Sequence, residues 1–234
     1  PYTMCDYNLN FIKEVEDKVV YVGHFTNSKK IKKVDNSDIE KLVKDNEFGY
    51  WMRTGNKSTN DGTGQRYEEV FHHNKMRNEK RIISHARNDP NIDSVIGKDG
   101  KKYSISEALD KKIDWMQIDI GFLSEQEKDT VLNLCKYAVV NGSHTVMGEI
   151  MGGKSKPIIG IPIYDEHTNQ IKWAEEKNLG VLANNTKEVL EGINKIKNEY
   201  GKFEEGLKDF SKNFNGNGAK NSAKLASEIL ENKK

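Results

Sequence analysis

The segment YAVVNGSHTVMGEIMGGKSKPIIGIPIYDEHTN, residues 137–169, carries the strongest fold signal in this chain. It contains two short apolar runs of buried-strand type, at 137–140 and 157–162. Polar turns at 141–145 and 164–169 follow these runs, and each turn leads into residues of helical character. We therefore predict two consecutive strands of a parallel sheet, each followed by a turn that begins a helix at the same sheet edge.

This edge is predicted to bind a ligand. Open α/β sheets bind ligands at the carboxyl ends of their strands. A helix N-terminus adds free N–H groups and the positive end of its dipole, which together favour an anion. Ser143 is the expected N-cap of the first helix, which should run from Val146 to Met151 and end at Gly152 and Gly153.

Strand and helix patterns alternate through the rest of the chain. Strands are expected at 19–23, 48–54, 80–86, 113–122 and 181–182. Helices are expected at 37–44, 65–73, 104–111, after Ser124, at 172–180 with a stop at Gly180, and at 186–200, 202–211 and 219–230. The polar stretch 87–102 is expected to be an insertion or a long loop. The predicted fold is α/β: a Rossmann-like, three-layer α/β/α domain with a parallel sheet.

A glycine-rich loop at 55–64 joins the strand at 48–54 to the helix at 65–73. Strand, glycine-rich loop and helix in this order are typical of a phosphate cradle, although the loop matches neither GxGxxG nor a Walker sequence. His85 ends another strand and could face the ligand edge, but a lone histidine is more often structural.

A family resemblance rests on a run of motif residues: Asn141, Gly142, Ser143, His144, Thr145, Glu149, Gly153, Lys156, Pro157, Ile158, Ile161, Pro162, Glu166, His167, Asn169, Glu175 and Gly180. This pattern resembles the C-terminal, donor-binding domain of GT-B glycosyltransferases, and most of all the MurG-like enzymes of family 28 and related archaeal predicted glycosyltransferases. It covers residues 115–182 most clearly and extends over 48–234. It departs at His167, where the family often has glutamine, and this leaves the donor sugar open.

The resemblance implies a UDP-sugar site. It assigns the donor phosphates to the loop residues Gly55, Lys57 and Ser58, and the uracil edge to Ile120, Gly121 and Phe122. It assigns contacts with the donor sugar to Asp165, Glu166 and His167.

The turn at 141–145 is expected to hold the diphosphate through its N–H groups and through the hydroxyls of Ser143 and Thr145. Gly142 and His144 complete this turn, and His144 is also a candidate catalytic residue. Glu149 lies four residues after Thr145, one turn deeper on the same helix face, where it could accept hydrogen bonds from both ribose hydroxyls.

The implied activity is transfer of a hexosyl or N-acetylhexosaminyl group to an acceptor hydroxyl, with inversion and without a metal or other cofactor. A GT-B enzyme has two Rossmann-like domains, and this length accommodates one. We therefore expect 1–25 to be a linker from a missing N-terminal domain, 26–214 the nucleotide-sugar domain and 215–234 a C-terminal helix. The general base should lie on the missing domain or subunit, so the chain alone should not catalyse glycosyl transfer.

Composition and charge limit which partners and which cellular location we expect for this chain. The chain has 234 residues, 35% hydrophobic residues and a net charge of +1, so nothing in its charge favours a nucleic-acid partner. The lack of a long apolar run and of a signal-peptide pattern predicts a location in the cytoplasm, with peripheral contact to a membrane and a lipid-linked acceptor left open. The cysteines, Cys5 and Cys135, are expected to be free thiols.

Three other functions remain open at this point. The chain could be a naturally separate donor-binding subunit recruited by a membrane partner. It could belong to the UDP-N-acetylglucosamine 2-epimerases, which share the GT-B fold. It could also be a nucleotide-binding regulatory module without transfer activity.

Overall fold

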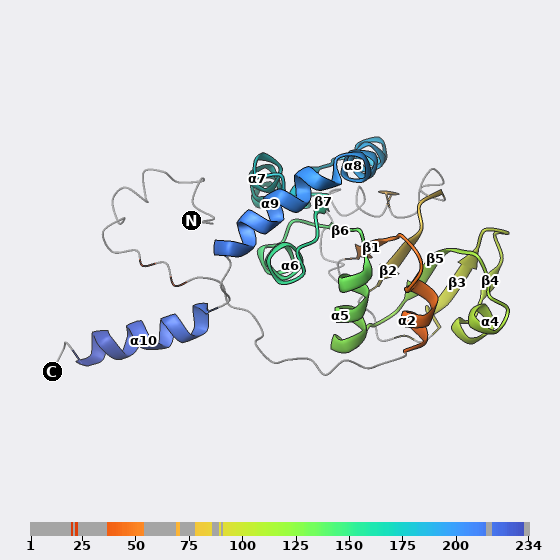
Figure 1. Cartoon of the computed structure of the whole chain (residues 1–234), viewed down its shortest axis with the longest axis horizontal. Coiled ribbons are helices and arrows are strands. Elements are labelled where there is room, and N and C mark those ends of the chain that lie inside the picture. Colours follow the sequence, from red (N-terminus) through yellow and green to blue (C-terminus); the bar gives the residue numbers. More distant parts are fainter. Residues whose placement is uncertain are drawn as a thin grey trace.

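The computed structural model describes residues 20, 22, 37–53, 69–70, 78–85, 89, 91–213 and 217–231. These residues form an eight-stranded sheet with helices against both faces (Figure 1). The predicted α/β, three-layer class is confirmed. The strand expected at 19–23, the glycine-rich loop at 55–64 and the helix at 65–73 lie wholly or mostly outside the described residues.

Six strands of the sheet are parallel. They are β1 (Gly49–Met52), β2 (Arg81–Ser84), β5 (Trp115–Ile120), β6 (Tyr137–Val140), β7 (Ile158–Gly160) and β8 (Gly180–Leu182). Their spatial order is β5-β2-β1-β6-β7-β8, which becomes 3-2-1-4-5-6 when these strands are counted along the chain. This is the strand order of the dinucleotide-binding Rossmann fold, in which the order reverses between the first and fourth strands. The reversal here lies between β1 and β6.

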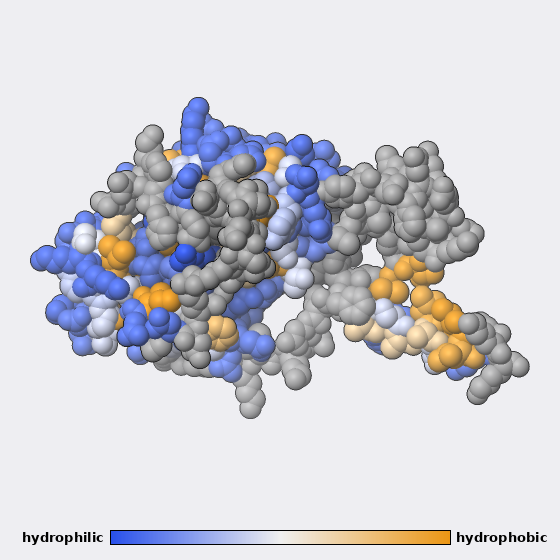
Figure 2. All heavy atoms as spheres, turned by 180° about the vertical axis from the view of Figure 1, so that it is seen from behind, coloured by the Kyte–Doolittle hydropathy of each residue, from blue (hydrophilic) through white to orange (hydrophobic). Residues whose placement is uncertain are grey.

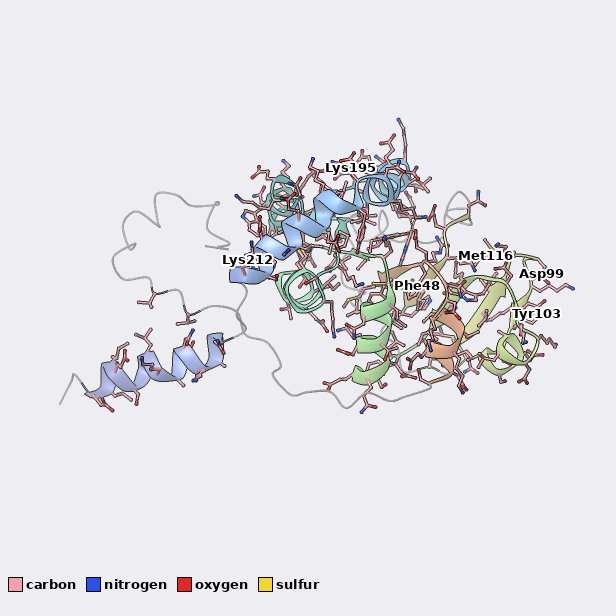
Figure 3. The ribbon with its side chains drawn as sticks, in the orientation of Figure 1. Phe48, Asp99, Tyr103, Met116, Lys195 and Lys212 are labelled. Carbon is pink, nitrogen blue, oxygen red and sulfur yellow. The ribbon has the colours of Figure 1, made fainter. Side chains whose placement is uncertain are left out.

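The stretch 87–102 was expected to be an insertion or a long loop, and of these two alternatives the long loop was wrong. It contains β3 (Ser94–Gly97), and with β4 (Lys102–Tyr103) forms an antiparallel hairpin that extends the sheet beyond β5. Asp99 and Gly100 make the turn, with Gly100 at a φ of 78° that suits glycine. The Tyr103 hydroxyl donates to the Asp99 carboxylate at 2.6 Å, and Figure 3 labels both residues at the far end of the sheet.

The helices largely follow the sequence pattern. They are α2 (Asp38–Val43), α4 (Ile105–Asp110), α5 (Glu125–Leu134), α6 (His144–Met147), the π-helical η4 (Gly148–Gly153), α7 (Asp165–Glu176), α8 (Thr186–Asn198), α9 (Tyr200–Asn213) and α10 (Gly218–Glu231). Ser104 and Ser124 form capping boxes with Glu107 and Glu127, as their spacing predicts. Gly180 does not end α7, because it is already the first residue of β8.

Alternate side chains of each central strand enter different layers of the core. Tyr50 packs with α2, α5, α6 and α7 on one face, whereas its neighbour Trp51 packs with α8 on the other. On the Tyr50 face, α2 is held to the sheet by a hydrogen bond, because the buried Trp115 indole donates to the Leu42 carbonyl at 2.9 Å. Both faces of the central strands are therefore buried, as a parallel sheet requires.

Helix α10 lies beyond the end of α9 and apart from the sheet (Figure 1). Hydrophobic side chains gather along it in Figure 2, and Ile229 and Leu230 are exposed. Its described contact with the N-terminal part of the chain is a hydrogen bond from the Asn221 amide to the Val22 carbonyl. None of the helices in the described part of the chain is long and apolar enough to cross a bilayer.

Candidate functional site

The turn between β6 and α6 is shaped by close packing against α7. Gly142 has a φ of 87°, and a Cβ atom there would lie 2.7 Å from Ile171 Cδ1 and 3.1 Å from His167 Cβ. Only glycine fits such a position without strain. The next residue is fixed by the Asn141 side chain, which accepts a hydrogen bond from the Ser143 N–H at 3.1 Å. The turn therefore brings the start of α6 against the start of α7.

In the described part of the chain, the N-termini of α6 and α7 have no side-chain cap. Ser143 and Tyr164 occupy the two N-cap positions without making a capping hydrogen bond. Other helices of the described structure do have caps, such as Ser37 on α2 and Asn185 on α8. Helix N-termini present backbone donors and positive dipole charge. Two adjacent N-termini without side-chain caps, at the carboxyl ends of β6 and β7, suit an anionic ligand.

Two histidines and a glutamate surround these N-termini. Burial lowers the pKa of both His144 and His167, and the nearby Glu166 carboxylate partly opposes this shift. His144 further lowers the pKa of His167. The His167 ring is buried edge-on against Tyr164, with ring centroids 5.1 Å apart, and its Nδ1 atom has no hydrogen-bond partner among the described residues. The cluster therefore combines one carboxylate with two imidazoles whose burial favours their neutral form, all at one edge of the sheet.

Glu149 lies in a π-helical turn rather than in the regular helix expected at 146–151. The α-helix ends at Met147 and continues as η4, whose wider turn contains Gly148 and Gly152. Glycine tolerates such irregular backbone, and π-helical turns occur often at functional sites. The Glu149 carboxylate accepts a 2.6 Å hydrogen bond from Lys128 Nζ of α5. A ligand that uses this carboxylate has to share it with Lys128 or displace Lys128.

The end of β5 presents one aromatic ring. Phe122 is 64% exposed, whereas Ile120 is buried. The Gly121 N–H donates to the Asp93 carboxylate at 2.8 Å. Because this donor is already engaged, the predicted reading of a uracil edge by Gly121 has to involve its carbonyl or a change of partner.

A further group of polar side chains lies where β1, β2 and β5 end. His85 Nδ1 lies 3.1 Å from Arg53 Nη1, and its Nε2 lies 2.8 Å from Asp119 Oδ1. His85 was considered from the sequence on its own, without Arg53 and Asp119. The available signal was their shared placement at the ends of strands that the pattern had already predicted.

Apart from Ile120, Gly121 and Phe122 at the end of β5, the predicted site residues fall into three groups. The structure brings together Gly142, Ser143, His144, Glu166 and His167, and it places the exposed Thr145 and Asp165 in the first turns of α6 and α7. Glu149 lies further along the same helical segment, beside Lys128. Gly55, Lys57 and Ser58 lie outside the described residues. No cluster of three metal-binding side chains occurs within the described ranges.

Comparisons with known proteins identify solved structures that have a similar fold. No family model and no curated protein matches the sequence. Similar solved structures include Phytolacca americana UGT2 complexed with UDP-2fluoro-glucose and pterostilbene (TM-score 0.58, 12% identity, 93% of this chain and 51% of that one). The glycotransferase of kitacinnamycin is also similar (TM-score 0.57, 11% identity, 93% of this chain and 50% of that one). Os79 from O. sativa in complex with UDP and deoxynivalenol-3-glucoside is similar as well (TM-score 0.55, 14% identity, 84% of this chain and 46% of that one).

These similarities show that the chain has the Rossmann-like fold found in GT-B glycosyltransferases. The chain spans about half the length of each of these solved structures.

Proposed function

We propose that this chain is the donor-binding half of a GT-B glycosyltransferase and that it binds a UDP-sugar at the carboxyl edge of its sheet. One observation carries the proposal: α6 and α7 begin without side-chain caps and lie side by side next to the β1/β6 reversal. This arrangement presents backbone donors and two positive dipole ends to a single anion. Similar folds bind UDP or a UDP-sugar analogue, which supports the same ligand class here.

The proposed orientation follows from the side chains around the edge. The diphosphate lies at the turn 141–145, and the ribose hydroxyls donate to Glu149 one helical step further on. The exposed Phe122 ring at the end of β5 offers a surface on which the uracil can stack. Glu166, Asp165 and His167 at the start of α7 are then left for the donor sugar.

In the proposed reaction, an acceptor hydroxyl attacks the anomeric carbon while the bond from that carbon to the diphosphate oxygen breaks. The hydroxyl proton goes to a general base, which we place on a second domain or subunit, and the sugar inverts. Negative charge grows on the departing UDP, and the N–H groups at the start of α6 are the groups of this chain that stabilise it. The MurG-like relationship and a mechanism without metal remain predictions.

Calorimetric titration with UDP tests the ribose assignment. We expect Glu149→Ala to weaken UDP binding by about 1.5–3 kcal/mol, the scale of hydrogen bonds to a charged group. Lys128→Met is the matched control, because it removes the present partner of Glu149 and leaves the carboxylate available. An unchanged affinity in Glu149→Ala would contradict the assignment, and a wild-type chain that does not bind UDP would contradict the proposed function.

The 2-epimerase function is the second candidate, because two imidazoles and a carboxylate meet at the sheet edge to which the donor sugar is assigned. The two reactions differ in their products. Transfer releases UDP and forms a glycoside with an acceptor, whereas epimerisation inverts C2 of UDP-N-acetylglucosamine. Chromatography of the products formed by the complete enzyme distinguishes them.

A further inference from the structure

The backbone at the end of β5 is already hydrogen-bonded on both of its sides. The Ile120 carbonyl accepts from the His85 N–H at 2.9 Å, and the Gly121 N–H donates to Asp93 Oδ1 at 2.8 Å. The first bond continues the pairing with β2, and the second reaches the residue that precedes β3. A nucleobase at this edge therefore meets the Asp93 carboxylate where it would otherwise meet the Gly121 N–H.

Asp93 is held in this place by the strand that follows it. Ser94, the first residue of β3, is buried and pairs with Asp119 of β5. Because β3 and β5 are antiparallel, the residue before Ser94 lies beside the end of β5. The Ser94 hydroxyl also donates to the Ile92 carbonyl at 3.1 Å. One oxygen of Asp93 is engaged by the Gly121 N–H, and in the described part of the chain the other, Oδ2, has no hydrogen-bond partner.

An exposed aromatic ring adjoins the same backbone. Phe122 is 64% exposed, although Gly121 and Leu123 on either side of it are buried. Such a ring offers a nucleobase a surface on which to stack. Phe122 directly follows the residue whose N–H holds Asp93, so a stacked base has a carboxylate near its edge. The end of β5 thus combines one flat apolar surface with one hydrogen-bond acceptor.

A carboxylate at this position discriminates between bases, because it accepts hydrogen bonds and donates none. Uracil carries a hydrogen on its ring nitrogen N3, which can donate to a carboxylate oxygen. Cytosine has a bare N3 at the same place, and its lone pair is repelled by a carboxylate. Adenine also lacks a ring N–H on its outer edge, whereas guanine has one at N1.

We infer that the Asp93 carboxylate accepts a hydrogen bond from the base of the nucleotide donor and selects a base with a ring N–H, as in uracil. Asp93 then extends the proposed function, on which this inference rests, from the diphosphate and the ribose to the base. The contact takes the place of one with the Gly121 N–H, which the family resemblance implied. Selection arises both from attraction to the N–H of uracil and from repulsion of a bare ring nitrogen.

Calorimetric titrations of the full chain with UDP and with CDP test this selection. We expect the wild type to bind UDP about tenfold to a hundredfold more tightly than CDP, the scale of one hydrogen bond to a charged group. In Asp93→Asn, the amide oxygen can still accept from the Gly121 N–H, which leaves the amide nitrogen to donate to the bare N3 of cytosine. We therefore expect the ratio of UDP affinity to CDP affinity to fall by about tenfold or more.

Asp89→Asn is the matched control, because it makes the same chemical change in the turn before β3. Asp89 Oδ1 accepts from the Asn91 N–H at 3.0 Å, and an amide oxygen can keep this bond. The ratio of UDP affinity to CDP affinity should stay within about twofold of the wild type, as for an ordinary surface substitution.

Asp93→Ala is a second variant, which removes the acceptor and frees the Gly121 N–H. We expect it to weaken UDP binding about tenfold without weakening CDP binding, since the repulsion of cytosine is lost as well. A gain in UDP affinity would contradict the inference, because it would mean that the Gly121 N–H itself binds the base.

The possible outcomes separate this inference from the proposed function. UDP binding that needs Glu149, but whose ratio to CDP binding is unchanged in Asp93→Asn, overturns the inference and leaves the proposed function intact. Equal losses of both ligands in Asp93→Asn also overturn it, since they indicate a structural role. Tighter binding of GDP than of UDP, weakened by Asp93→Asn, supports the carboxylate contact and overturns the uracil assignment. If the wild type binds none of the three nucleotides, both proposals are wrong.

Discussion

His144 and His167 are the residues whose charge state matters most at the proposed diphosphate site. Both imidazoles are partly withdrawn from water at helix N-termini, where a positive charge is already unfavourable. Their lowered pKa values keep both rings neutral near pH 7. They can then serve as hydrogen-bonding groups without placing an unfavourable positive charge at the two helix N-termini.

These shifts predict how stability depends on pH. The pKa of each histidine is lower in the folded chain than its ordinary value of about 6.5, so the unfolded chain binds more protons in this range. Their contribution to stability is therefore complete above about pH 6.5 and is lost as the pH falls toward the folded pKa values.

Urea unfolding at pH 8 and pH 5.5 measures this dependence. We expect the double variant His144→Gln, His167→Gln to lose less stability between these values than the wild type. Equal losses in the two proteins would show that the two imidazoles do not contribute to the difference.

Individual site residues could be predicted where the signal was local. Gly142 and Ser143 stand in a strand–turn–helix pattern, and the structure gives them the turn and N-cap positions that the pattern predicts. The pairing of Glu149 with Lys128, and of His85 with Arg53 and Asp119, could not be predicted, because each pair joins residues from different elements. Such contacts depend on strand order, which short motifs do not specify.

Among the elements, the short helices were predicted best because their signals lie within a few residues. Ser37, Ser104 and Ser124 all cap the helices expected after them. The β3–β4 hairpin was missed because each strand is short and only Val95 and Ile96 are apolar in β3. Its Asp-Gly turn was visible in the sequence, but pairing with β5 is what makes the segment a strand.

Helix α9 allows a prediction at the scale of one element. A Cβ atom at Gly206 would lie 2.6 Å from the Lys177 carbonyl oxygen and 2.7 Å from that of Asn178, both of them backbone atoms. The same atom at Gly201 of this helix would meet nothing within 4 Å. We expect Gly206→Ala to destabilise the chain by about 1–3 kcal/mol through overpacking.

Gly201→Ala is the matched control, because it makes the same chemical change on the same helix. We expect it to be neutral or to stabilise the chain by up to about 1 kcal/mol through helix propensity. Chemical denaturation measures both variants. Similar effects at the two positions would contradict close docking of α9 on the turn after α7.

At the scale of the whole molecule, the parallel pairing of β1 with β6 explains why segments far apart in sequence end at the same edge of the sheet. Arg53 follows β1 and the turn 141–145 follows β6, although nearly ninety residues separate them. The parallel α/β class was predictable from alternating strand and helix patterns. The complete order was not, because the hairpin at one end and the position of β1 in the middle depend on packing.

Ligand binding should therefore stabilise the domain as a unit. At a UDP concentration about 100 times Kd, binding adds about 2.7 kcal/mol to the free energy of unfolding. For a chain of this size we expect the melting temperature to rise by about 5–10 °C. Differential scanning calorimetry with UDP, with uridine and with sulfate at equal concentration measures this rise.

The Glu149→Ala variant should show a much smaller rise with UDP at the same concentration. If sulfate alone produced the full effect in the wild type, the site would be a general anion site and not one for a nucleotide.

The turns of the candidate site follow β6 and β7, and each of these strands has a neighbour on both sides. Amides of such strands exchange with solvent only when the sheet opens as a whole, whereas the hairpin at its margin and α10 can fray on their own. The turns of the candidate site are thus anchored to the slowest-opening unit of the domain. Local opening of the hairpin or of α10 then leaves the spacing between these two turns unchanged.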